Sequence, residues 1–168
     1  MLPRDLKFMN TFVEGVGFAG ECQKVTLPPL TKKTTPFRGG GMIGELKQTK
    51  GLEPIEVEHT YFGYNVELVK QSGVTAVDGL QVRWVGSFQR DDEASADQVE
   101  IVVRGFHEEI PRGDQQPGEE NTMTAKTACS YYKEILNGQV LVEIDILNMI
   151  WIVNGVDLLA QHRRNIGL

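Results

Sequence analysis

Apolar and polar residues alternate with a period of two along much of this chain. In the segment 139–146 the two kinds of side chain separate onto opposite faces, with Val140, Val142, Ile144 and Ile146 against Gln139, Glu143 and Asp145. This pattern is typical of a β-strand that rests one face on a hydrophobic core and leaves the other in water. Asn137-Gly138 just before it predicts a tight hairpin, because a type I′ turn needs positive φ at both central residues. We therefore interpret the stretch from Thr127 to Asp157 as structural scaffold.

Comparable segments predict further strands along the chain. They are expected at residues 8–15, 18–27, 55–62, 80–89, 98–110, 122–136 and 139–145. The segment 55–62 shows the alternation clearly, with Ile55, Val57 and Tyr61 on one face and Glu56, Glu58 and Thr60 on the other. Many amphipathic strands of this kind predict a mainly β domain whose exposed strand edges must be paired or covered.

Two helices are expected. The first is short, lies within 64–72 and is capped by Gly73, so it needs docking to be stable. The second follows Asn154-Gly155 and ends at Gly167. Asp157 in its first turn and the basic residues His162, Arg163 and Arg164 in its last turn complement the helix dipole.

The stretch from Pro28 to Pro54 differs from the rest of the chain. It is rich in glycine and proline, and it predicts at most one short strand, at 43–49. Long irregular connections inside compact domains are uncommon and usually functional or disordered. Its apolar side chains disfavour disorder. We interpret it as an arm that docks on a neighbouring copy through Leu30, Phe37, Arg38, Gly39, Gly40, Gly41 and Met42; a locally folded surface loop is the alternative.

Size, charge and cysteine content narrow the classes of function. The 168 residues suit a single domain, 1–168, with its own core. A net charge of −6 disfavours a protein that grips nucleic acid through phosphate contacts. No uncharged apolar run approaches the roughly 18 residues of a membrane span, so no stable membrane association is expected. The first residues lack an apolar h-region, so secretion through a signal peptide is not expected. Cys22 and Cys129 are expected to be small buried apolar residues, and synthesis in the cytoplasm is expected.

Catalytic and cofactor motifs give no positive signal, so we expect neither an enzyme nor a cofactor. Gly15-Val-Gly17-Phe-Ala-Gly20 matches a dinucleotide fingerprint, but β-forming residues follow it where the motif needs a helix N-terminus. The histidines His59, His107 and His162 are scattered, without metal-ligand spacing. Adjacent acids on a strand point to opposite faces, so they cannot act together on one substrate.

Several short motifs carry a resemblance through their order and spacing. They are Leu27-Pro-Pro-Leu-Thr-Lys-Lys-Thr, Phe37-Arg-Gly-Gly-Gly-Met, Gly51-Leu-Glu, Val99-Glu-Ile-Val-Val-Arg-Gly, Ser130-Tyr-Tyr-Lys, Asn137-Gly138, Glu143-Ile-Asp145, Val153-Asn-Gly-Val-Asp157 and Gly167-Leu168. Together they resemble the major tail tube proteins of contractile-tailed phages and R-type pyocins over nearly the whole chain. Phe37 stands where that family is expected to have tyrosine.

The resemblance implies a mainly β (α+β) fold and a structural role. It implies a β-sandwich or barrel of two packed antiparallel sheets with one or two short helices, whose subunits share a closed β-barrel in hexameric rings. Stacked rings would form the inner tail tube that a sheath drives through the target envelope for genome delivery. Implied partners are further copies, the sheath protein, baseplate or tube initiator and tail terminator proteins, and tape measure protein and then DNA in the lumen. The implied location is the virion tail, assembled in the host cytoplasm.

Charged faces of the predicted strands then have two possible places in a tube. We expect Glu56 and Glu58, together with Glu100 and Glu108, to line the lumen, where they would repel DNA phosphates. The alternative is an outer wall that meets a basic sheath. Two other functions remain open from the sequence: a sheath or baseplate-type structural protein of the same particle, and a small monomeric β-barrel binding module.

Overall fold

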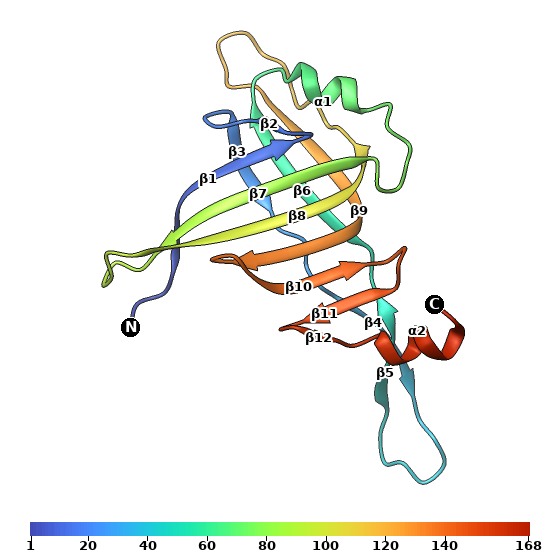
Figure 1. Ribbon diagram of the computed structural model, residues 1–168. Helices are drawn as coiled ribbons and strands as arrows, with labels where there is room; N and C mark the ends of the chain where they lie inside the picture. The colour runs from blue at the N-terminus through green and yellow to red at the C-terminus, as the bar shows by residue number, and fades with distance from the viewer.

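Twelve strands and two short helices make up the protein, whose computed structural model describes residues 1–168. The strands are β1 (Asp5–Val13), β2 (Val16–Gly17), β3 (Cys22–Thr26), β4 (Lys32–Phe37), β5 (Leu46–Leu52), β6 (Ile55–Phe62), β7 (Leu80–Gln89), β8 (Ala96–Glu109), β9 (Thr122–Leu136), β10 (Gln139–Asp145), β11 (Ile150–Val153) and β12 (Val156–Asp157). The helices are α1 (Val66–Gln71) and α2 (Ala160–Ile166) (Figure 1).

Ten of the strands form one antiparallel sheet that is arranged around β9. The main path runs β12-β11-β10-β9-β8-β7-β1-β2. The first half of β9 pairs with β6, which in turn pairs with β3, and the second half pairs with β10; β8 lies along the opposite side of β9. The sheet bends along β9, so β3 and β6 pass behind β1, β7 and β8 (Figure 1). The predicted mainly β fold with short helices is therefore confirmed.

The bend brings two backbones unusually close at Gly105. The pairing of β8 with β9 shifts register between Arg104 and Gly105. A Cβ atom at Gly105 would lie 1.8 Å from the carbonyl oxygen of Ala128. Only glycine fits there, because any side chain would collide with main-chain atoms that cannot move independently.

The hydrophobic core lies between the two layers. Ile55, Val57 and Tyr61 of β6 face it from one side, and Val82 and Trp84 of β7 from the other. Leu68 of α1 is fully buried and closes one end. Because the core is between the layers, the outward side chains of β6 point away from those of β7 and β8.

A chain of hydrogen bonds between side chains crosses this core. Tyr61 Oη and His59 Nδ1 lie 2.7 Å apart, and His59 Nε2 lies 3.1 Å from Thr127 Oγ1. Thr127 Oγ1 is 2.9 Å from His107 Nδ1, and His107 Nε2 is 3.3 Å from Gln71 Oε1 on α1. With that carbonyl as acceptor, each neutral imidazole donates through Nε2 and accepts through Nδ1. The two rings, far apart in the sequence, are 5.6 Å apart between centroids. Two histidines that are scattered in the sequence therefore meet in the fold.

Burial keeps both histidines neutral. It lowers the pKa of His59 to about 3, with a smaller contribution from the neighbouring His107. Burial likewise lowers the pKa of His107 to about 4. Both side chains are buried, so the pair is part of the core. The structure has no group of three or more His, Cys, Asp or Glu side chains that could hold a metal ion.

Several predicted boundaries need correction. Helix α2 begins at Ala160, later than expected, because Val156 and Asp157 pair with β11 after a turn at Asn154-Gly155. Asp157 instead forms an ion pair with Arg163 of the helix. Ser72, not Gly73, is the C-cap of α1. Cys129 is buried as expected, which raises its pKa to about 12, whereas Cys22 is only half-buried.

The histidine pair predicts a loss of stability in mild acid. The unfolded chain binds protons near pH 6.5, whereas the folded chain excludes them until about pH 4 and 3. Stability that is present above pH 6.5 is therefore lost as the pH falls towards those values. The slope is expected to be up to about 1.4 kcal/mol per pH unit for each histidine. Urea unfolding between pH 7 and pH 5 measures it.

His107→Gln should reduce that slope by up to about 1.4 kcal/mol per pH unit, because one of the two titrating groups is removed. His162→Gln, on the exposed side of α2, is the matched control and should leave the slope unchanged. Equal slopes for wild type and His107→Gln would contradict this explanation.

Candidate subunit interface

The arm predicted from Pro28 to Pro54 is a folded hairpin. β4 and β5 pair antiparallel in a sheet of their own, with Phe37 opposite Leu46, and the hairpin projects away from the body (Figure 1). The prediction of at most one short strand is therefore wrong. Every residue of β4 is exposed, and its sequence shows no alternation of apolar and polar residues. It is a strand because it pairs with β5. Pro36 is tolerated because the outer edge of β4 needs no ladder hydrogen bond.

The tip of the hairpin, residues 37–46, combines an apolar surface with one cation. Ile43 is fully exposed, and Phe37 and Leu46 are each nearly half exposed. Arg38 donates from Nε to the carbonyl of Met42 over 3.2 Å, which leaves its two terminal amino groups as free donors. Gly41 has φ +84°, a conformation that favours glycine. Of the predicted arm residues, Phe37 to Met42 therefore lie together at the tip, whereas Leu30 is exposed ahead of β4.

The four acids predicted for a lumen fall on two faces. Glu56 and Glu58 lie on the outward face of β6, while Glu100 lies on the outward face of the layer containing β7 and β8. Glu108 is eight residues along β8 from Glu100, about 27 Å in an extended strand. It belongs with the β6 group, because it and Glu58 both help to raise the pKa of Lys126. One wall cannot hold all four.

Lys126 is the centre of the first group. On β9 it stands between Glu58 of β6 and Glu109 of β8 in the strand register. Its ammonium group lies 3.1 Å from Glu109 Oε2, and this hydrogen bond is the main cause that raises its pKa. The carboxylates outnumber the cation, so this face stays acidic.

Glu100, in contrast, is not a free negative charge. Arg83 of β7 holds it with both branches of the guanidinium, with Nε 2.6 Å from Oε1 and Nη2 3.2 Å from Oε2. This hydrogen bonding lowers the pKa of Glu100, and Lys133 contributes in the same direction. The bidentate geometry fixes both side chains on the sheet surface. Reasoning from the sequence missed Arg83 because only strand register places it beside Glu100.

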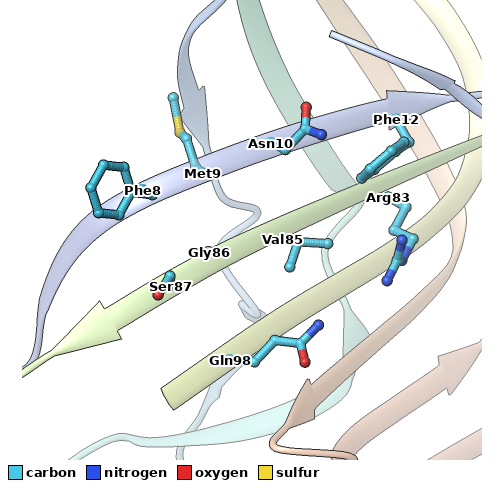
Figure 2. Close-up of a pocket in the computed structure, with 9 residues that line it drawn as sticks. All are labelled: Phe8, Met9, Asn10, Phe12, Arg83, Val85, Gly86, Ser87 and Gln98. Atoms are coloured by element: carbon cyan, nitrogen blue, oxygen red, sulfur yellow. The ribbon is translucent and has the colours of Figure 1, made fainter. Parts of the chain in front are cut away.

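A broad open groove lies on the same face. Figure 2 shows Phe8, Asn10 and Phe12 of β1 beside Val85 and neighbouring residues of β7 and β8. Its volume is about 500 Å³, and it is too open to enclose a small ligand. The Arg83 guanidinium lies 5.2 Å from the centre of the Phe12 ring, a cation–π contact. The face therefore presents a firmly held mixture of aromatic, polar and paired charged groups.

Both ends of the main sheet are open. β2 pairs with β1 at Phe12 and Val13, and the Phe18 amide donates to the Thr11 carbonyl, so residues 5–10 of β1 have no strand partner on that side. At the other end β12 pairs with β11 at Ile152 and Val153, and the Leu158 amide donates to the Trp151 carbonyl, so the open edge there is the outer side of the short strand β12. Phe8, on the open stretch of β1, is 78% exposed. Uncovered strand edges are templates for pairing with another chain.

Comparison with known proteins decides the family. The model of the phage tail tube protein FII family matches residues 3–167. The chain belongs to this family. It is 41% identical over 170 residues to the tail tube protein of Escherichia phage P2, and the matched region covers 99% of each chain. It is 31% identical to the major tail tube protein of Serratia phage KSP20, over 94% of this chain and 91% of that one.

A solved structure extends the likeness to the fold. The chain matches a component of the sheath-tube complex of the extracellular contractile injection system PVC, in its extended state. The TM-score is 0.57 at 10% identity, over 80% of this chain and 90% of that one. As a member of the family, this tail tube protein is a structural component of the inner tail tube and thus of the virion tail, and not an enzyme. Neither helix is long and apolar enough to cross a membrane.

Substitutions in the projecting hairpin of this tail tube protein test whether the hairpin tip is part of the hydrophobic core. Changing Gly39, Gly40 and Gly41 together to valine strains the tip but meets no atoms of the body. Apart from local strain at Gly41, about 1–3 kcal/mol for a side chain held at positive φ, the free energy of unfolding of the monomer should stay that of wild type, while polymerisation should be lost. Thermal melting measures the first and sedimentation the second. Gly73→Val, at another open position, is the control and should do neither. An unfolded triple variant would place the tip in the core.

Proposed function

We propose that six copies of this chain form a ring, and that rings stack into the inner tube of a contractile tail. A contracting sheath would drive this tube through the target envelope, so that the genome can pass. The observation that carries the proposal is the pair of open strand edges at opposite ends of one sheet. Family membership supplies the tube role, and the open edges supply a means of ring closure.

Ring closure would join the β1 edge of one subunit to the β10–β12 end of the next. Such a contact is heterologous, since two different surfaces meet, and it gives a ring when the rotation closes. A closed barrel shared by the subunits leaves no uncovered edge. The lone subunit lacks this closure, because its sheet path ends at β2 and β12.

If β1, β7 and β8 lie in the shared barrel, one outward face of the subunit would face the lumen and the other would face the sheath. The outward face of these strands, with the Arg83–Glu100 pair and the groove of Figure 2, would line the lumen. The acidic face around Lys126, with Glu56, Glu58 and Glu108, would then face the sheath. Glu100 occupies the Arg83 guanidinium, so this cation would not be free to bind DNA phosphates in such a lumen.

Further partners follow from the family role. The ends of a stacked tube need a baseplate or initiator complex at one end and a terminator at the other. The lumen would hold tape measure protein and later DNA, without specific binding. Assembly would take place in the cytoplasm of the bacterial host. Each of these partners would meet a different surface of the ring, which the separate hairpin, sheet edges and acidic face make possible.

Polymerisation of the purified protein tests the proposal. Rings and tubes are expected in negative-stain micrographs and as large species in sedimentation, because the open sheet edges of neighbouring copies would pair with one another. Seeding with tail initiator complex should speed tube growth. A protein that stays monomeric at high concentration and adds to no tube in the presence of initiator would overturn the ring-and-tube proposal.

Lysine substitutions test the assignment of the two walls. Glu56→Lys combined with Glu58→Lys should give tubes of normal length that fail to acquire a sheath, because the acidic outer face is reversed. Asp78→Lys, in an exposed loop, is the control and should be sheathed normally. Electron microscopy of particles assembled in infected cells distinguishes the two. Sheathed double-variant particles that fail to deliver DNA would instead place Glu56 and Glu58 in the lumen.

A further inference from the structure

The charge of the chain is divided unequally between the hairpin and the body. Residues 32–52 contain five lysines and arginines against one glutamate, a net charge of +4. The remaining residues then carry −10, since the whole chain carries −6. The tip of the hairpin adds the exposed apolar side chains of Phe37, Ile43 and Leu46. A basic projection with an apolar end favours a partner surface that is acidic at its rim and apolar within.

Such a surface exists at the opposite end of the molecule. The hairpin points down in Figure 1, and the end of β6, α1 and the loop of residues 111–120 lie at the top. A pocket of about 400 Å³ lies there, lined by Gly20, Phe62, Gly63, Glu120 and Asn121. The exposed side chains of Phe62, Tyr64 and Val66 form an apolar margin along the chain beside it.

The pocket contains acceptors that fit a guanidinium group. Glu120 is exposed and is in none of the ion pairs within the subunit. Asn121 Oδ1 is buried without a hydrogen-bond partner, an arrangement that costs free energy until a donor arrives. The main chain of Glu21 lies next to the pocket, since its carbonyl accepts a hydrogen bond from the Phe62 amide at 2.8 Å.

We propose that the hairpin tip of one copy docks on this end of a second copy, with Arg38 entering the pocket between Glu120 and Asn121. The free amino groups of Arg38 would donate to the Glu120 carboxylate, and Ile43 would cover Phe62. A carboxylate and a guanidinium can pair through two parallel hydrogen bonds, which gives this contact direction as well as strength.

The occupant is a second copy because the two surfaces lie at opposite ends of the same chain. A contact between opposite ends repeats head to tail without closing, so it extends a stack. The open sheet edges would close the ring, whereas this contact would join one ring to the next. The inference therefore rests on the proposed function and names the surfaces that stacking uses.

Charge exchange tests this pairing. Arg38→Glu and Glu120→Arg should each weaken stacking by at least about tenfold, seen as a higher protein concentration needed for tube growth, because each places like charges together. The double variant should recover growth close to wild type. Sedimentation and negative-stain microscopy measure tube length, and single rings should remain in both single variants.

Matched controls are available on the same elements. Two control variants should keep tube growth near wild type. Lys50→Glu changes a residue of β5 nearer the base of the hairpin. Glu119→Arg changes the neighbour of Glu120, which does not line the pocket. Thermal melting checks that every variant folds.

The outcomes separate the two proposals. Tubes that form equally well with Arg38→Glu and Glu120→Arg would overturn the docking and leave the tube function standing. Loss of growth in the single variants without recovery in the double variant would also overturn the pairing, and would indicate another acceptor on the second copy or on an end-binding protein. Failure of the wild-type protein to form rings or tubes would overturn the proposed function and the docking together.

Discussion

The double pairing of β9 is the constraint on which the rest of the structure depends. Because β6 and β10 share one side of this strand in succession, the sheet must bend, and the bend requires Gly105 where a Cβ would meet the Ala128 carbonyl. The bend creates two layers with a core between them. It also sends the outward faces in opposite directions, which gives a thin domain two chemically distinct walls, as a tube subunit needs.

A buried polar chain fixes how the layers meet. His59 of β6, Thr127 of β9 and His107 of β8 satisfy each other's hydrogen bonds, and Gln71 extends the chain to α1. Apolar residues alone would tolerate sliding, whereas a fully paired network is satisfied in one register. Neutral histidines suit this role, because burial lowers the pKa of both well below the ordinary value.

The surface divides the tasks of assembly among separate elements. The sheet ends at β1 and at β11–β12 are uncovered, the acidic group surrounds Lys126, and the basic hairpin stands clear of the body. A contact between sheet edges and a contact between hairpin and pocket use different residues. In the proposed assembly, lateral closure and axial growth would therefore be strengthened or weakened independently.

The sequence by itself determined the strands that rest on the core, because burial of one face imposes a period of two. It also determined the Asn137-Gly138 turn, whose φ values are +48° and +83°, since local sterics decide it. It marked the residues of the hairpin tip, but not β4, whose polar residues become a strand only by pairing with β5. The tertiary structure alone decided the rest: the meeting of His59 with His107, the capture of Glu100 by Arg83, and the separation of Glu100 from Glu56 and Glu58. Each depends on register across strands distant in sequence, and alternation along one strand contains no information about its neighbour.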